Sequence, residues 1–257
     1  MKQLLSCLLL CCMLHLAVVA APPKVLVFSK TKGFRHDAIP VGKLALIKLG
    51  AENNFAVDTT EDASAFTDQN LKQYKAVIFL HTTGDVLDSA QQLAFQRFIE
   101  HGGGYVGIHA ATDTEYDWPW YGKLAGAYFV NHPAQQEAIL HVEDHHRSQA
   151  TQALPDEWKR KDEWYNFRDI QPDLHVLLTI DEKSYTGGSN GAVHPMAWYH
   201  DYDGGRAFYT ELGHTLSSYT DPLYLGHVLG GINYAIGRKK GAMQVAGVSA
   251  HQVMPQQ

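Results

Sequence analysis

Short apolar runs alternate with helical patterns through the first half of this chain, and this alternation limits the possible folds more than any other feature. A run such as residues 76–80, Ala-Val-Ile-Phe-Leu, has no polar side chain and is typical of a strand buried on both faces. We expect strands at residues 24–29, 55–59, 76–80 and 105–108, and helices at residues 38–49 and 88–100. The pattern predicts an α/β fold in which a mostly parallel sheet is covered by helices on both faces.

The second half of the chain is less regular. Residues 196–202 and 206–210 are strand-like and flank Asp203-Gly204-Gly205, which predicts a β-hairpin added to the sheet. Further strands are expected at residues 138–142 and 174–179, and helices at residues 118–124 and 224–236. Because neither a repeat nor a linker is visible, we expect one domain over residues 22–237 and a loose tail over residues 238–257.

Residues 1–21 have the features of a signal peptide. Lys2 gives a positive start, residues 4–19 are largely apolar, and cleavage is expected after Ala20 or Ala21. The apolar run is too short for a good membrane-spanning helix, although an uncleaved anchor and lipidation at Cys7 stay open. The sequence therefore predicts an exported protein, periplasmic or secreted, without membrane contact after cleavage.

Composition excludes several classes of function. The three cysteines, Cys7, Cys11 and Cys12, lie in the signal segment, so the mature protein has neither a disulfide nor a thiol nucleophile. The net charge of −6, without a basic stripe, argues against a nucleic-acid partner, and we expect no nucleotide cofactor. Fifteen histidines are many for this length and indicate metal ligation or acid–base chemistry.

Polar residues follow the expected strands at the positions where the strands end. Because ligands of open α/β sheets bind beyond the carboxyl ends of the strands, we expect these residues to converge on one edge. They are Lys32, Arg35 and His36 after the first strand, His81 and Asp85 after the third, His109 and Asp113 after the fourth, and Glu211 and His214 after the last. His36, Asp85 and Asp113 can instead cap helices, and His81 can bond a neighbouring carbonyl.

The segment Gly102–Ala111 is typical of a nucleophile elbow, a constrained turn that presents one side chain at the sheet edge. His109 occupies the position of that side chain. Imidazole chemistry or metal ligation must therefore be considered in place of thiol chemistry. Glu211 and His214, three residues apart, suit a metal-ligand pair or an acid–base pair, and an ordinary ion pair is the alternative.

Two further features combine polar groups with proline or aromatic residues. His132 and His194 each precede a proline, which favours an extended backbone. Residues 162–167, which we expect to form a loop, join two carboxylates to three aromatic side chains. This mixture suits sugars, because their C–H faces stack on aromatic rings while their hydroxyls bond to carboxylates. Trp164 and Phe167 can equally pack the core.

With these motifs, the sequence resembles the ThuA-like (trehalose utilisation) family of the class I glutamine amidotransferase-like superfamily. The matching motifs extend through nearly the whole mature domain and comprise residues 32–36, 80–85, 102–114, 162–165, 194–198 and 205–215. The resemblance implies a flavodoxin-like, doubly wound sheet and a role in carbohydrate utilisation, alongside oxidoreductases that make 3-keto-glycosides. His109 stands where amidotransferases have cysteine, and Glu211-Leu-Gly-His214 stands where they have a histidine-x-glutamate pair, so glutaminase activity is not expected.

We therefore expect an exported enzyme, a hydrolase or lyase, whose substrate is a small carbohydrate such as a 3-keto-glycoside. Its catalytic centre would comprise His109, Glu211 and His214, with Asp113 orienting a histidine. A divalent metal, with zinc as the first expectation, would be held by residues among His36, His81, His109, His132 and His214. The expected substrate-binding residues are Lys32, Arg35, Asp85, Glu163, Trp164 and Tyr165.

A non-catalytic carbohydrate-binding protein is the main alternative, and an interaction domain is a third. The binding protein would use the same sheet edge and aromatic residues without turnover, so that substituting the aromatics would abolish affinity and substituting the histidines would not. The sequence leaves open which sugar is bound, which bond is broken and whether the protein forms a homo-oligomer.

Overall fold

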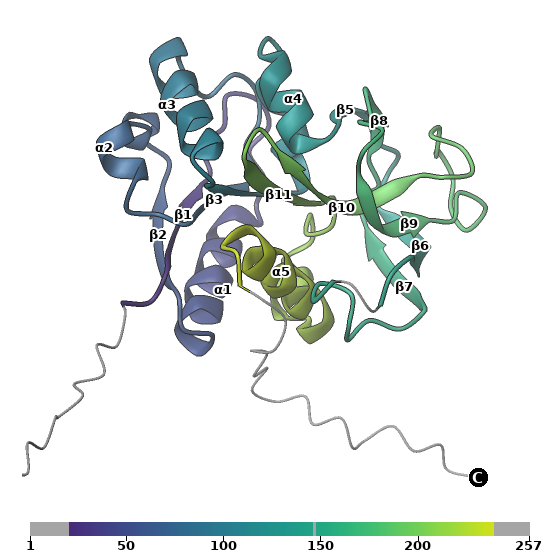
Figure 1. Ribbon diagram of the computed structural model, residues 1–257. Helices are drawn as coiled ribbons and strands as arrows, with labels where there is room; N and C mark the ends of the chain where they lie inside the picture. Colours follow the sequence, from purple (N-terminus) through teal and green to yellow (C-terminus); the bar gives the residue numbers. More distant parts are fainter. Residues whose placement is uncertain (1–20, 146–147, 239–257) are drawn as a thin grey trace, which may run out of the picture.

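The computed structural model describes residues 21–145 and 148–238 (Figure 1). Its strands are β1 (Lys24–Phe28), β2 (Ala56–Thr60), β3 (Ala76–Leu80), β4 (Gly104–Ile108), β5 (Tyr128–Asn131), β6 (Gln136–Val142), β7 (Glu157–Asp162), β8 (Asn166–Arg168), β9 (His175–Ile180), β10 (Pro195–Tyr202) and β11 (Gly205–Thr210). Its helices are α1 (Ile39–Glu52), α2 (Asp68–Leu71), α3 (Ser89–Glu100), α4 (Pro119–Ala125) and α5 (Pro222–Ala235), with short 3-10 turns η1 (Ala63–Ala65), η2 (His109–Thr112) and η3 (Leu216–Thr220). The predicted signal segment and tail lie outside the described residues except for Ala21 and Arg238.

Nine of the described strands form one mixed sheet in the order β2-β1-β3-β4-β11-β10-β9-β6-β7. The first five are parallel to one another and the last four run antiparallel to their neighbours. The α/β fold with a large mixed sheet is therefore confirmed. The β10–β11 hairpin is not an appendage, because β11 pairs in parallel with β4 and joins the two parts of the sheet.

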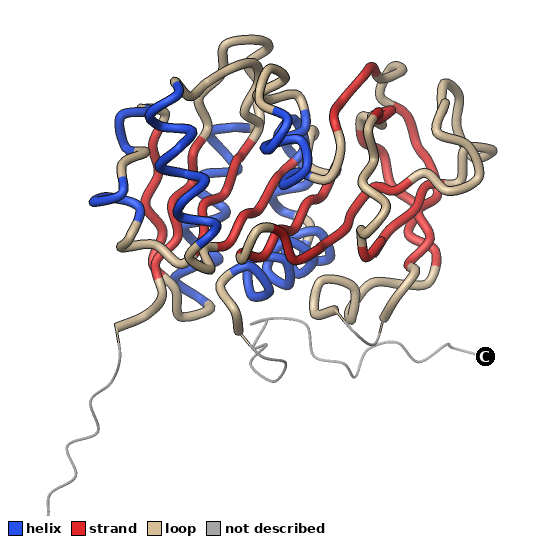
Figure 2. Tube along the Cα trace, turned by 45° about the horizontal axis from the view of Figure 1, so that its top comes forward, coloured by secondary structure: helices blue, strands red, loops and turns tan. Residues whose placement is uncertain are grey.

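Helices cover the parallel part of the sheet on both faces (Figures 1 and 2). α1 and α5 lie on one face, and α2, α3 and α4 lie on the other. α3 begins where the sequence indicates, because Asp88 and Gln91 form a reciprocal capping box at its first turn. Within the described residues, no helix combines the length and apolarity that crossing a bilayer requires.

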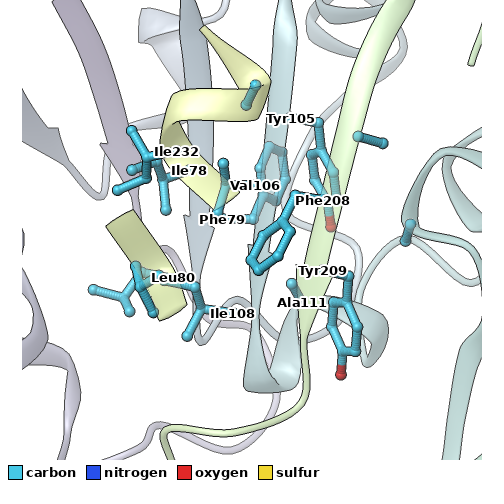
Figure 3. Packing of buried hydrophobic residues seen from close by; sticks show 14 of the residues in the cluster. Ile78, Phe79, Leu80, Tyr105, Val106, Ile108, Ala111, Phe208, Tyr209 and Ile232 are labelled. Carbon is cyan, nitrogen blue, oxygen red and sulfur yellow. The ribbon is translucent and has the colours of Figure 1, made fainter. Parts of the chain in front are cut away.

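The core lies on both sides of β3, β4 and β11. Figure 3 shows Phe79, Tyr105 and Phe208 among the side chains that fill it, and every residue of β3 is fully buried. Burial on two faces explains the continuous apolar run of β3, since neither face meets water. Each large side chain buried here stabilises the fold by about 1.5–3 kcal/mol, so the strand ends form a rigid support for the residues that follow them.

Three strands of the second half were not expected from the sequence: β5, β7 and β8. β7 alternates buried and exposed residues, and most of its exposed side chains are charged. Its Lys and Arg side chains therefore mask the strand pattern. Residues 162–167, expected as a loop, include the end of β7 and the start of β8.

Candidate metal centre

His81 and His109 occupy equivalent strained turns at the carboxyl ends of neighbouring strands. Leu80 at the end of β3 is paired with Ile108 at the end of β4, and each histidine follows directly. Both histidines have φ of 52°, in the left-handed region that a residue with a side chain rarely adopts. Such strain persists where the surroundings impose it, and it clusters at functional sites. The two imidazole rings lie 5.2 Å apart, centroid to centroid.

Four side chains from separate parts of the chain meet at this edge. His36, His109, Glu163 and His214 each offer one ligand atom, and these atoms all lie within 4.8 Å of one another. His36 comes from the loop between β1 and α1, His109 begins η2, Glu163 follows β7, and His214 follows β11. We call this group the four-donor cluster.

The spacing of three of these donors fits a metal ion. His214 Nδ1 lies 3.1 Å from His109 Nε2 and 3.1 Å from Glu163 Oε2, and His109 Nε2 lies 3.4 Å from Glu163 Oε2. Ligands bound tetrahedrally at about 2.0–2.1 Å are separated by about 3.3 Å. Imidazoles with a carboxylate suit zinc, iron, manganese or nickel.

His109 is oriented by contacts behind the four-donor cluster. Its Nδ1 lies 2.7 Å from the carbonyl oxygen of Glu211, so Nδ1–H donates there and the Nε2 lone pair faces the cluster. The Tyr209 hydroxyl donates to the carbonyl oxygen of His109 at 2.7 Å. Both contacts fix the imidazole in the orientation that a ligand needs.

Glu211 supports the cluster from within the core. It is fully buried, its Oε1 lies 3.6 Å from His109 Nδ1, and the same oxygen accepts a hydrogen bond from the Tyr165 backbone N–H. Burial raises the pKa of the Glu211 carboxyl well above its usual range, and the nearby Asp162 adds to the effect. Glu211 therefore positions His109 and Tyr165 from behind and is not one of the four donors.

The electrostatics of the site combine two buried imidazoles of lowered pKa, His36 and His81, with a carboxylate, Glu163, that raises the pKa of His214 against the effect of burial. Burial lowers the pKa of His36 to about 3 and that of His81 well below its usual value. Burial favours a higher pKa for Glu163, but its contacts with His109 and His214 outweigh it and hold that pKa well below its usual range. Within the described residues, Nδ1 of buried His36 has no hydrogen-bond partner. The described part of the protein thus leaves one nitrogen of this imidazole without a partner, and the same holds for Nδ1 of His81.

Two predicted metal ligands lie beside the cluster rather than in it. His132 is 39% exposed, and its Nδ1 lies 3.2 Å from Glu163 Oε1. His81 is fully buried behind His36 and His109, and its Nε2 is bonded to the Tyr219 hydroxyl at 2.8 Å. Glu163, which the sequence suggested as a sugar-binding residue, instead completes the donor set.

Two predicted substrate-binding residues, Trp164 and Arg35, make their contacts away from the cluster. Trp164 is fully buried, and its Nε1 donates to the carbonyl oxygen of Gln136, so it packs the core. Arg35 makes a two-pronged ion pair with Glu61 on the surface. Lys32 and Asp85 are exposed on their loops. Tyr165 alone of the aromatic candidates reaches the centre, with its ring 4.4 Å from that of His109.

Asp113 does not orient a histidine by a direct hydrogen bond, as the sequence suggested. Its Oδ1 accepts from the Tyr116 hydroxyl at 2.7 Å. Burial raises the pKa of Asp113, although His109 and His132 lie near enough to act against that rise. Asp113 therefore lies at the border of the site as a carboxyl group that holds its proton more strongly than usual.

Asp162 is a supporting residue that sequence reasoning did not assign. Its Oδ2 accepts from the backbone N–H of Gly213 at 3.1 Å and from Arg160 at 3.0 Å. Gly213 has φ of 114°, which favours glycine, and it directly precedes His214. Asp162 thus fixes the turn that delivers His214. The adjacent Asp-Glu pair was the available signal, but it does not indicate which carboxylate faces inward.

Comparison with known proteins shows what this chain is similar to. The family model for ThuA, described as trehalose utilisation, matches residues 24–235. A solved ThuA-like protein from Bacteroides uniformis is 25% identical, with a TM-score of 0.72 and coverage of 88% of this chain and 97% of that one. A second, from Parabacteroides merdae, is 21% identical, with a TM-score of 0.70 and coverage of 86% and 93%. A β-galactosidase from Bacillus circulans shares the fold alone, at 12% identity and a TM-score of 0.53, over 83% of this chain and 30% of that one. No curated protein matches the chain.

Proposed function

Since this chain belongs to the ThuA family of trehalose utilisation, we propose that it is a carbohydrate-utilisation enzyme, a hydrolase or lyase that acts on glycosides such as 3-keto-glycosides. The observation that supports this best is the four-donor cluster at the carboxyl edge of the parallel strands, the edge where open α/β sheets bind ligands. The signal-like segment before residue 22 supports export to the periplasm or the medium.

The proposed centre holds a divalent transition metal, with zinc as the first expectation. His36, His109, Glu163 and His214 would bind it, and their donor types and mutual distances fit such an ion. When bound, the ion would supply Lewis acidity to a carbonyl or enolate oxygen of the substrate.

The remaining residues of the site would move protons. A ketone acidifies the neighbouring C–H, so elimination breaks that C–H bond and the C–O bond to the leaving group; the base gains one proton and the leaving oxygen takes another. His132 lies outside the donor set and is partly exposed. We assign to it the role of the general base that removes the C–H proton. Asp113, whose pKa is raised by burial, would supply the proton to the leaving oxygen. Solvent then resets both groups.

Phe129, which is half-buried beside His132, would form the wall against which the sugar packs, with the buried ring of Tyr165 behind it. The rings of Phe129 and Tyr165 lie 4.2 Å apart, and that of Tyr165 also lies 4.4 Å from His109. The accessible face of an aromatic ring accepts the C–H face of a pyranose ring. The same wall beside Glu163 also supports the alternative, a carbohydrate-binding protein without turnover.

Metal content and turnover test the proposal together. Protein purified without added metal or a histidine tag should contain a divalent metal by elemental analysis and convert 3-keto-trehalose or 3-keto-sucrose. His109→Ala should lose both properties, and His101→Ala, at an exposed site on the far end of α3, should keep them. A metal-free, fully active preparation would exclude the metal, and intact turnover in His109→Ala would place the centre elsewhere.

Calorimetry separates the enzyme from the binding protein. Titrations of trehalose, sucrose and their keto forms into wild type and His214→Ala would be compared. Equal affinity in both proteins, without turnover in either, would favour the binding protein.

A further inference from the structure

Phe34 is the one strongly exposed aromatic side chain in the described part of the chain. It is 67% exposed, and its ring meets that of His36 edge to face, with centroids 4.8 Å apart. His36 is a member of the four-donor cluster and is itself almost fully buried. Phe34 therefore lies next to the cluster on its solvent side.

The backbone of Phe34 is fixed by one buried side chain, Thr83. The Thr83 hydroxyl accepts from the Gly33 backbone N–H at 3.1 Å and donates to the Phe34 carbonyl at 2.9 Å. The Thr83 carbonyl accepts from the Lys32 backbone N–H at 2.8 Å. A Cβ at Gly33 would approach Thr83 to 3.3 Å, so this contact is tight. The loop thus holds an apolar ring in water at a defined place, and a ring preorganised in this way loses little freedom when it contacts a ligand.

We propose that Phe34 is a specificity residue that stacks on the outer unit of the substrate, the group that leaves when the glycosidic bond breaks. This inference rests on the proposed function. A sugar ring whose reacting carbons lie at the four-donor cluster would extend its leaving group past His36 towards Phe34, the exposed side chain whose ring contacts His36. The substrate class is therefore a glycoside with a flat apolar outer unit, either a second pyranose ring or an aromatic aglycone.

The effect of Phe34 should depend on the size of the outer unit. We compare methyl, phenyl and glucosyl 3-keto-glycosides with metal-loaded wild type, Phe34→Ala and Phe34→Trp. Phe34→Ala should raise KM for the phenyl and glucosyl substrates roughly 3- to 10-fold, with kcat changed less than about twofold, because an outer contact binds ground state and transition state alike. KM for the methyl substrate should be unchanged in Phe34→Ala. In Phe34→Trp, KM for the phenyl and glucosyl substrates should equal that of wild type.

The matched control is Leu44→Ala on α1, since Leu44 is 68% exposed and is not part of the site. It should leave all three substrates unchanged. If Phe34→Ala alters the three substrates equally, or none of them while wild type turns them over, the inference is wrong and the proposed function stands. If Phe34→Ala splits an oligomer in light scattering without a dependence on the outer unit, Phe34 is an interface residue and the inference is wrong. If wild type neither binds nor converts any of the glycosides, the proposed function fails and this inference fails with it.

Discussion

The parallel and antiparallel parts of the sheet contribute to the four-donor cluster by different routes. In the parallel part, the loops after β1, β4 and β11 open at the same edge, so the topology alone brings His36, His109 and His214 together. In the antiparallel part, Glu163 follows β7, the last strand of the sheet. It reaches the cluster because Arg160 and Asp162 of β7 are bonded to Ser218 and Gly213 in the segment after β11, and because residues 163–165 are held by contacts to the core.

Those contacts are specific. The Tyr165 backbone N–H donates to Glu211, and its carbonyl accepts from His194 Nε2 at 2.8 Å. The imidazoles are thus placed by strand connectivity, whereas the carboxylate is placed by tertiary hydrogen bonds. A centre assembled in this way needs both parts of the sheet to be folded before it can bind an ion.

The largest expected effect comes from removing one donor of each part. His109→Gln in the parallel part and Glu163→Gln in the antiparallel part should each lower metal affinity more than about 100-fold, beyond the loss from disturbing only a supporting contact. Metal titration followed by calorimetry measures this, with thermal unfolding as a check on the fold. Metal affinity of wild-type strength in Glu163→Gln would mean that the parallel part binds the ion alone.

The next effect concerns Asp162, which forms a buried ion pair with Arg160 of the same strand and connects the two parts of the sheet through its hydrogen bond from Gly213. Asp162→Asn removes the charge that Arg160 faces while both residues stay almost fully buried. We expect a loss of about 3 kcal/mol in the free energy of unfolding, as for other broken buried pairs. Metal affinity should fall roughly tenfold, since the turn at Gly213 loosens. Urea unfolding and metal titration test both expectations.

Asp221→Asn is the matched control for that experiment. Asp221 is the other carboxylate that Arg160 contacts, at 3.4 Å, and it is one-third exposed. Asparagine also caps α5 as well as aspartate does. Asp221→Asn should therefore lower the free energy of unfolding by less than about 1 kcal/mol. Equal losses in the two variants would show that Asp162 has no special role in holding the turn.

The same division explains how much the sequence could reveal. Strands buried on both faces, such as β3 and β4, have continuous apolar runs, and the capping residues of α3 are local, so these elements were predictable. The convergence of His36, His109 and His214 followed from the rule that parallel strands end at one edge. The position of Glu163 could not follow, because β7 has a charged, alternating pattern and pairs only with β6, the neighbour it meets after folding.

The direction of side chains also limited how much of the site could be predicted from the sequence. Trp164 and Tyr165 are adjacent, yet one packs the core against Tyr185 and the other lies on His109. Successive residues of an extended segment point to opposite sides, so the sequence could not tell which aromatic faced the centre without the register. Arg35 and His36 divide in the same way, with the arginine on the surface and the histidine in the cluster.

A smaller effect should appear in the pH dependence of stability. His227 on α5 joins the two parts: its Nδ1 bonds the Ala150 carbonyl, and its Nε2 bonds the Thr210 hydroxyl of β11. Burial lowers the pKa of His227 to about 4 from 6.5. Above pH 6.5, His227 is neutral in both the folded and the unfolded protein, and its full contribution to the free energy of unfolding is present. As the pH falls from 6.5 towards 4, His227 takes up a proton in the unfolded state but stays neutral in the folded state. The free energy of unfolding therefore decreases.

This loss can be isolated with His227→Gln. Between pH 7.5 and pH 5 the wild type should lose about 2 kcal/mol more than the variant in the free energy of unfolding. Urea unfolding at the two pH values gives the difference. Parallel losses in wild type and variant would show that other buried histidines account for the acid sensitivity.

The smallest effect is expected at Arg35, on the surface of the parallel part. Its guanidinium is engaged by both carboxylate oxygens of Glu61, at 2.8 and 2.9 Å, and is half exposed. Arg35→Ala should therefore cost about 0.5 kcal/mol in unfolding free energy, and Lys43→Ala, which removes the other cation on Glu61, should cost a similar amount. Because the ion pair keeps the guanidinium away from the four-donor cluster, KM for glycosides should stay within about twofold of wild type. A several-fold rise in KM would show that Arg35 leaves Glu61 when substrate binds, and the parallel part would then supply a mobile substrate contact as well as the imidazoles.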